Sequence, residues 1–386
     1  MRRKIMYIHQ LQEWPSFRWN QEVLFVPLAD IRFRQGRLMG RMESLGFSQR
    51  DEALLRALTE EVVKSSEIEG EILNHDQVRS SIVRQLGMDI AGLLPSDRRV
   101  DGVVQMTLEA TQNFAQPMSQ KRLFLWHSAL FPNVASNIKV GAWRDDANGP
   151  MQVVSGAIGR ERVHYEAPSA ERLEFEMAAF FNWVNQTGDI DPVIIAANAH
   201  LWFVTIHPFD DGNGRVARAI ADWVLARFEN SSRRYYSMSA QIRRERKEYY
   251  DILERTQKGT LDITEWVLWF LRCLDRAIAE TEILLATVLK KDLFWKTHAH
   301  FAFNERQRLL LNKILDATFQ GNLTSSKWAK LAKCSQDTSQ RDIVELIDHG
   351  ILVKDTAGGR STSYSLKELG VGKQKFKKHP LLIALK

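Results

Sequence analysis

A strongly apolar stretch near the middle of the chain, from Val193 to Ile206, limits the folds open to this sequence. Asp191 and Pro192 precede it, and an acidic cap followed by proline is typical of the first turn of a helix. Fourteen residues are too few to cross a bilayer, which takes about 20. The stretch therefore predicts a buried helix inside a protein core, and no membrane partner is expected.

Other parts of the chain repeat apolar residues at helical spacing. This pattern predicts helices over 48–70, two within 99–130, and others over 214–228, 238–257, 260–289 and 304–317. Between 132 and 170 the composition shifts to glycine, asparagine and β-formers, which predicts a small hairpin over 151–165. The expected fold class is mostly α, a helical bundle with one small β-hairpin flap.

Composition sets the domain count and the compartment. The chain has 386 residues, and domains average about 150, so two or three domains are expected. Cys273 and Cys334 are its two cysteines, too few for a disulfide framework and without the spacing of a zinc site. The N-terminus has neither an uninterrupted apolar core nor a small-residue cleavage site. We expect a cytoplasmic protein.

The segment that joins helices 191–206 and 214–228 has the composition of a phosphate-binding loop. Gly212, Asn213 and Gly214 tolerate left-handed backbone angles, so they can turn successive N–H groups toward an anion at the start of the next helix. Arg215 and Arg218 lie on neighbouring faces of that helix, where two guanidinium groups can hold further phosphate oxygens. A ligand with more than one phosphate is expected.

Two further side chains of this loop suggest the chemistry. Asp211 would repel phosphates unless a cation lies between them, and Mg²⁺ commonly binds through one or two carboxylates plus phosphate oxygens. His207 is the nearby side chain whose unperturbed pKa suits general-base work at neutral pH. The expected site therefore combines a magnesium–nucleotide complex with a base that deprotonates an incoming hydroxyl.

The segment from His207 to Arg218 resembles the signature of the Fic family, His-Pro-Phe-x-Asp/Glu-Gly-Asn-Gly-Arg-x-x-Arg, at all nine fixed positions. The resemblance implies transfer of AMP from ATP to a hydroxyl side chain of a target protein, itself included, with release of diphosphate. It implies that His207 is the catalytic base and Asp211 the Mg²⁺ ligand. The ATP-binding residues it implies are Gly212, Asn213, Gly214, Arg215, Val216, Ala217 and Arg218, with Arg218 on the γ-phosphate.

The same resemblance assigns roles to the hairpin and to two tyrosines. Fic enzymes have a hairpin over the site that pairs with an extended target segment, and Val153, Val154 and Val163 are the candidates here. Tyr249 and Tyr250 resemble the aromatic position that lines the adenine pocket. An ordinary surface hairpin and a pair of core aromatics are the alternatives.

A second segment, from Ser65 to Gly70, is similar to the inhibitory motif Ser/Thr-x-x-x-Glu-Gly/Asn of Fic proteins. Ser65 and Glu69 are four residues apart, so they share a helix face. The resemblance implies that Glu69 pairs with Arg218 and holds ATP in a non-productive pose. It also permits the opposite activity, in which this glutamate assists removal of AMP from the target. A solvated glutamate at an acidic helix end is the alternative.

The C-terminal end carries the basic charge of the chain. Residues 296–386 hold 16 Lys and Arg against 8 Asp and Glu. Three predicted helices and a hairpin with Arg360 near its tip indicate a winged helix, whose partner is DNA or a protein. The predicted divisions are an N-terminal helical region 1–95 with the inhibitory helix, a Fic core 96–290, a winged helix 296–370 and a basic tail 371–386. A DNA-binding regulator with a nucleotide-sensing core is the alternative function, and a homodimer is left open.

Overall fold

The computed structural model divides the chain into two compact units, Met1–Glu282 and Ile283–Lys386. The residues that the structure describes are 6–90, 92–132, 138–156, 159–186, 188–315, 319, 321–355 and 362–367. None of the helices in these ranges combines the length and the hydrophobicity needed to pass through a membrane.

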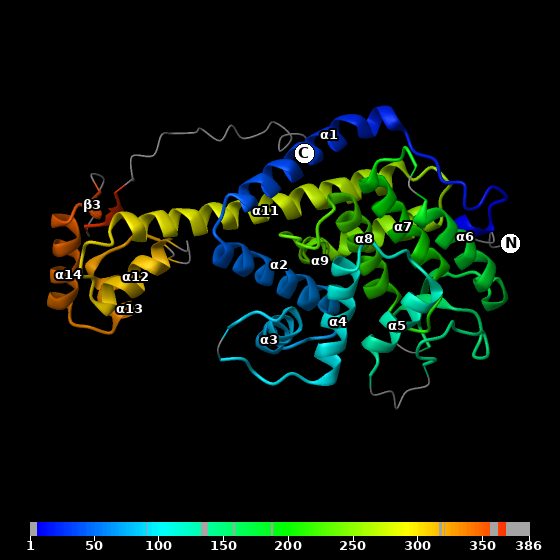
Figure 1. Cartoon of the computed structure of the whole chain (residues 1–386), viewed down its shortest axis with the longest axis horizontal. Helices are drawn as coiled ribbons and strands as arrows, with labels where there is room; N and C mark the ends of the chain where they lie inside the picture. Colours follow the sequence, from blue (N-terminus) through cyan, green and yellow to red (C-terminus); the bar gives the residue numbers. More distant parts are fainter. Residues whose placement is uncertain are drawn as a thin grey trace. The chain divides into compact units, whose positions relative to one another are not determined.

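The first unit is built almost entirely of helices (Figure 1). Its elements in chain order are η1 (Ile8–Gln10), α1 (Gln21–Glu43), α2 (Phe47–Ile68), α3 (His75–Leu86), α4 (Arg98–Gln112), α5 (Gln120–Leu130), β1 (Gln152–Ser155), β2 (Arg162–Glu166), η2 (Ala170–Arg172), α6 (Leu173–Asn185), α7 (Pro192–Ile206), α8 (Asn213–Glu229), α9 (Met238–Arg244) and α10 (Arg246–Gln257). α11 (Thr264–Thr297) contains the boundary between the units. The mostly α fold class is confirmed.

α7 is the predicted buried helix. Asp191 caps it by accepting a hydrogen bond from the Val193 N–H at 2.8 Å, and Pro192 is its first residue. From Val193 to Ile206 every residue but one is buried, and α8 packs along it more extensively than any other helix does. The helix pair α7–α8 therefore forms the centre of the first unit and fixes the loop between them.

β1 and β2 form the predicted hairpin, paired antiparallel with Val154 opposite Val163. The turn residues 157–158 lie outside the described residues. Tyr165 on β2 is buried against Tyr7 from the N-terminal segment, and Val153 packs against the same small cluster. The N-terminal segment therefore packs against the hairpin, although it is more than 140 residues away in sequence.

One sequence-based helix prediction differs from the structure. The helix predicted over 238–257 is interrupted at Glu245, which leaves helical geometry at φ −105° and ψ 25° between α9 and α10. Its carboxylate pairs with Arg276 on α11 at 2.5 Å, a contact that the local sequence pattern does not contain. The predicted division at residue 95 lies within the first compact unit and stays a prediction.

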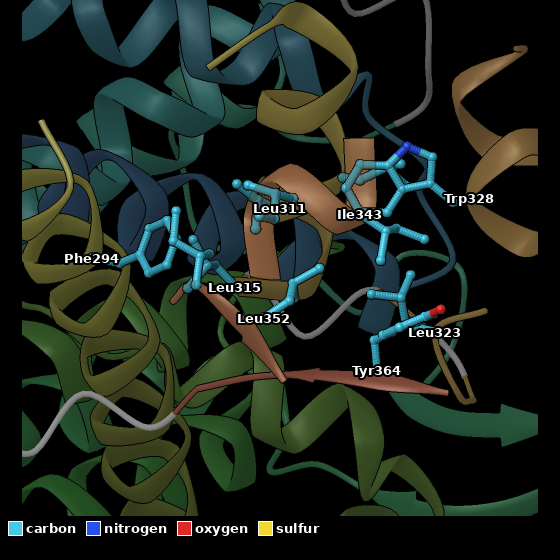
Figure 2. Packing of buried hydrophobic residues seen from close by; sticks show 11 residues of the cluster. Phe294, Leu311, Leu315, Leu323, Trp328, Ile343, Leu352 and Tyr364 are labelled. Atoms are coloured by element: carbon cyan, nitrogen blue, oxygen red, sulfur yellow. The ribbon is translucent and has the colours of Figure 1, made fainter. Parts of the chain in front are cut away.

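The second unit contains α12 (Glu305–Leu315), α13 (Ser325–Ala332), α14 (Gln336–Asp348), β3 (Leu352–Lys354) and β4 (Tyr364–Leu366). β3 and β4 pair antiparallel, so the predicted helices and hairpin are present. Figure 2 shows the apolar core that these elements share, with Trp328 and Ile343 facing it from α13 and α14. The predicted wing tip at Arg360 and the basic tail 371–386 lie outside the described residues.

Candidate active site

The loop between α7 and α8 reverses the chain through two left-handed residues. His207, which ends α7, has φ 52° and ψ 57°, and Gly212, which precedes α8, has φ 78°. Asn213 and Gly214 are already helical, so only one of the three residues expected to be left-handed is so. A histidine with these left-handed backbone angles carries about 1–3 kcal/mol of strain, so it persists only where its surroundings hold it.

Asn213 closes this loop on itself instead of contributing a left-handed turn. Its side chain amide donates to the Phe209 carbonyl at 2.7 Å, and its carbonyl oxygen accepts from the Phe209 N–H at 3.0 Å. Both side-chain atoms are buried. This pair of hydrogen bonds fixes the start of α8. The first N–H groups of the helix have no partner within it and point toward the loop.

The His207 imidazole is oriented as a base. Its Nδ1–H donates to the Val204 carbonyl at 3.2 Å, which leaves Nε2 as the unprotonated nitrogen. Burial lowers the pKa of His207 below its usual 6.5; Arg144 acts in the same direction, whereas the Val204 carbonyl, Glu69 and Asp211 oppose it. The ring is therefore neutral at physiological pH, as proton acceptance requires.

Arg218 on α8 is buried and already occupied on one side. It donates to Glu69 Oε1 at 2.8 Å, to Ser65 Oγ at 2.9 Å and to the Ser65 carbonyl at 2.9 Å. Its Nη1 atom is buried and has no hydrogen-bond partner among the described residues. An unpartnered guanidinium nitrogen in such a place fits a further anionic acceptor, such as a phosphate oxygen.

Glu69 lies against the start of α8. A Cβ atom placed on Gly214 would come within 2.1 Å of Glu69 Oε1, so only glycine admits the carboxylate here. Glu69 is the C-cap of α2, and Gly70 follows with φ 86°, which ends the helix and aims the side chain inward. The predicted Glu69–Arg218 pair is present, and the carboxylate also occupies the positive end of the helix where an anion is expected.

The C-terminal third of α2 is held in this position by polar contacts. Glu61 accepts hydrogen bonds from Ser237 Oγ at 2.7 Å and from the Ser239 N–H at 3.0 Å, both at the start of α9. At the last residue of the helix, Arg246 Nε donates to the Ile68 carbonyl at 2.8 Å. The part of the helix that presents Glu69 is therefore fixed to α9 and α10.

A second carboxylate, which the sequence analysis did not assign, occupies the other arginine of the loop. Glu71 Oε2 pairs with Arg215 Nη1 at 2.7 Å, and Glu71 Oε1 pairs with Arg99 Nε at 3.1 Å. The Arg215 side chain is only 6% exposed. The sequence signal was the acidic character around Glu69, but nothing local indicated that Arg99, at the start of α4, would hold Glu71 in place.

Asp211 is the predicted metal ligand. Its side chain is 60% exposed, and Oδ1 accepts from the Gly212 N–H at 2.6 Å. No group of three or more metal-binding side chains occurs in the described part of the chain. A single accessible carboxylate fits Mg²⁺, which completes its shell with water and phosphate oxygens.

The remaining predicted residues lie less directly at the loop. Tyr249 is 2% exposed, hydrogen-bonds His200 at 2.9 Å and packs on Trp269, which favours the core alternative for this tyrosine. Tyr250 is partly exposed, and Arg246 lies over its ring. Val216 and Ala217 are fully buried on α8, so their side chains serve packing.

The three hairpin valines differ from one another. Val154 is 49% exposed, Val163 is half-buried, and Val153 packs toward Tyr165. Their role in docking a target stays a prediction.

Comparison with known families matches two stretches of the chain. Residues 117–225, which include the loop described above, match the Fic/DOC family. Residues 7–88, which include α2 and Glu69, match a domain of unknown function, DUF4172.

Individual relatives match only parts of the chain. A protein adenylyltransferase Fic from Nematostella vectensis is 34% identical over 115 residues, 29% of this chain and 25% of that protein. A uridine 5'-monophosphate transferase from Xanthomonas campestris pv. campestris is 26% identical over 151 residues, 35% of this chain and 26% of that protein. A Fic family protein from Desulfovibrio desulfuricans G20 has a TM-score of 0.49 at 20% identity, covering 90% of this chain and 97% of that one. The matched region is thus about a quarter of the length of these curated relatives.

Proposed function

Because residues 117–225 form a Fic/DOC family domain, we propose that this protein is an adenylyltransferase that moves AMP from ATP to a Ser, Thr or Tyr hydroxyl of a target protein. Two observations together support this most directly. His207 is neutral with Nε2 unprotonated, and the buried Arg218 has a donor atom, Nη1, without a partner among the described residues. The first provides a base, and the second provides charge for a polyphosphate.

In the proposed reaction, His207 Nε2 accepts the proton of the target hydroxyl as its oxygen attacks the α-phosphorus. The bond between the α-phosphorus and the bridging oxygen breaks, and diphosphate leaves. Arg218 and the first N–H groups of α8 hold the phosphates in line. Asp211 would hold Mg²⁺, which neutralises phosphate charge when bound.

We further propose that the chain as described is in an inhibited state. Glu69 occupies the start of α8 and one side of Arg218, so a polyphosphate must displace it or bind elsewhere. Glu71 neutralises Arg215 in the same way. Two carboxylates on one segment therefore stand where two sets of phosphate oxygens are expected.

The C-terminal unit does not favour the regulator alternative. Asp337, Glu345 and Asp348 are exposed on α14, next to Arg341, and carboxylates repel the DNA backbone. Ser339, in the first turn of α14, is fully buried and so cannot contact a base edge. We therefore propose a protein partner for this unit. The unpaired thiols of Cys273 and Cys334 are compatible with the cytoplasmic location that we propose.

The test is self-modification of wild type and Glu69→Gly with ATP and Mg²⁺, followed by intact-mass measurement. A gain of one AMP that is stronger in Glu69→Gly is the expected result. UTP is tested in parallel, and a gain of UMP in place of AMP would show that UTP is the donor. If neither variant gains AMP or UMP, the proposed transfer is overturned.

The lowered pKa of His207 predicts an unusual pH profile. A histidine loses its base function as it becomes protonated below its pKa, and burial moves this pKa below 6.5. We therefore expect the acid limb of the transfer rate of Glu69→Gly to have its midpoint below pH 6.5. A rate profile between pH 5 and 8 measures this, and a midpoint above 6.5 would contradict the assigned base.

Replacing Glu71 by glutamine should free Arg215 and raise AMP incorporation about fivefold, the lower end of typical coupling between sites. The effect is smaller than that of Glu69 because Arg218 stays paired. Glu67→Gln is the matched control, since Glu67 lies four residues earlier, near the end of α2, but pairs with Lys64 and Arg243 instead. Equal rates for wild type and Glu71→Gln would show that the Arg215 pair does not restrain transfer.

A further inference from the structure

We propose that Arg144 is a positioning residue that holds His207 in its reactive geometry and connects it to the β1–β2 hairpin. The inference rests on the proposed function, because it concerns the base of that reaction. Arg144 lies in the segment between α5 and β1, and its side chain is completely buried. Arg144 is not among the residues proposed to bind ATP.

The contacts of Arg144 converge on the backbone around the base. Its N–H donates to the Pro208 carbonyl at 3.0 Å, and its Nε donates to the His207 carbonyl at 2.8 Å. Two consecutive carbonyls of the strained turn are therefore held by one residue. His207 is one of three residues other than glycine with positive φ among those described, so an external restraint of this kind is what keeps its ring in place.

The other face of the guanidinium reaches the segment that follows the hairpin. Arg144 Nη2 donates to the Pro168 carbonyl at 2.5 Å, two residues after β2 ends. Its Nη1 donates to Asp146 Oδ1 at 2.8 Å, and Asp146 Oδ2 accepts from the Ala170 N–H at 2.6 Å. The pair of Arg144 and Asp146 thus connects the end of the hairpin to the base. A target segment that docks on the hairpin would act on a structure already joined to His207.

The charge of Arg144 has a separate effect on the base. Burial is the main reason that the pKa of His207 is lowered, and the nearby guanidinium lowers it further. The other charged groups that act on the ring are Glu69 and Asp211, which raise its pKa. Removing the positive charge of Arg144 should therefore move the acid limb of the rate profile to higher pH, whereas a lysine should leave it in place.

The experiment compares Arg144→Lys and Arg144→Gln in the Glu69→Gly background. Lysine keeps the charge but not the planar fork that reaches the His207 and Pro168 carbonyls and the Asp146 carboxylate, so kcat should fall about tenfold or more with KM for ATP unchanged. Glutamine loses both, so its acid limb should also shift upward. Arg122→Lys is the matched control, because Arg122 is likewise buried and donates to three backbone carbonyls but contacts no residue of the His207–Arg218 loop.

Thermal unfolding of each variant separates positioning from folding. The inference would be overturned if Arg144→Lys and Arg122→Lys had the same kcat, whether both match the parent or both lose activity equally. If Arg144→Gln folds and its acid limb does not shift, the proposed effect of the Arg144 charge on His207 is overturned. If glutamine prevents folding, the kcat of Arg144→Lys alone decides whether Arg144 positions His207. Complete inactivity of the Glu69→Gly parent with every donor would instead overturn the proposed function, so the two failures are distinguishable.

Discussion

Glu69→Gly is expected to raise AMP incorporation by about 10- to 100-fold, which lies within the roughly 5- to 150-fold effect typical of coupling between linked sites. The Glu69 carboxylate pairs with Arg218 at 2.8 Å and lies against Gly214, so its removal opens both the guanidinium and the start of α8. The same change should lower the free energy of unfolding by about 1.5–3 kcal/mol, because a buried arginine loses a charged hydrogen-bond partner.

Opposite changes in rate and stability are the diagnostic result. A substitution that merely loosened the fold would lower both, whereas removal of an inhibitory group raises one and lowers the other. Initial rates of AMP incorporation and thermal unfolding, each with and without ATP, measure the two quantities. Glu69→Gln and Glu67→Gln form a matched pair that differs only in which carboxylate is neutralised. A rate for Glu69→Gln no higher than for Glu67→Gln would contradict inhibition by the Arg218 pair.

His207→Ala, measured in the Glu69→Gly background, is expected to reduce transfer by about 10²- to 10⁴-fold, the usual contribution of a general base. Its Nδ1–H is committed to Val204, so Nε2 is the nitrogen that receives the proton. ATP affinity should change little, because Arg218 and the start of α8 remain intact.

Titration calorimetry with ATP and Mg²⁺ provides the control for this second variant. Unchanged affinity together with lost transfer assigns His207 to the chemical step. Loss of ATP binding would instead mean that the alanine disturbs the turn at φ 52°, and His207→Asn, which tolerates left-handed angles, then decides. Transfer by both variants at the parental rate would remove His207 from the mechanism.

Much of the fold follows from local pattern. Apolar composition and the Asp191–Pro192 cap predict α7, and helical spacing predicts α2 and α8 to within two residues. These signals are local because hydrogen bonds and side-chain periodicity within a helix involve near neighbours. The residue types of the loop between α7 and α8 form a local pattern in the same way, and their role in phosphate binding stays a prediction. The break at Glu245 was not, because it accompanies a contact with Arg276 on another helix.

Local patterns in the sequence specify the central helices, the hairpin and the residue types of the segment from His207 to Arg218. The pairing of carboxylates with arginines comes from the packing of the helices, since Glu71, Arg99 and Arg215 lie in distant parts of the chain. The same packing buries Tyr249 and brings Arg144 against the His207 carbonyl. Ion pairs and burial depend on how helices pack, and residue types along one helix do not specify which partner meets them.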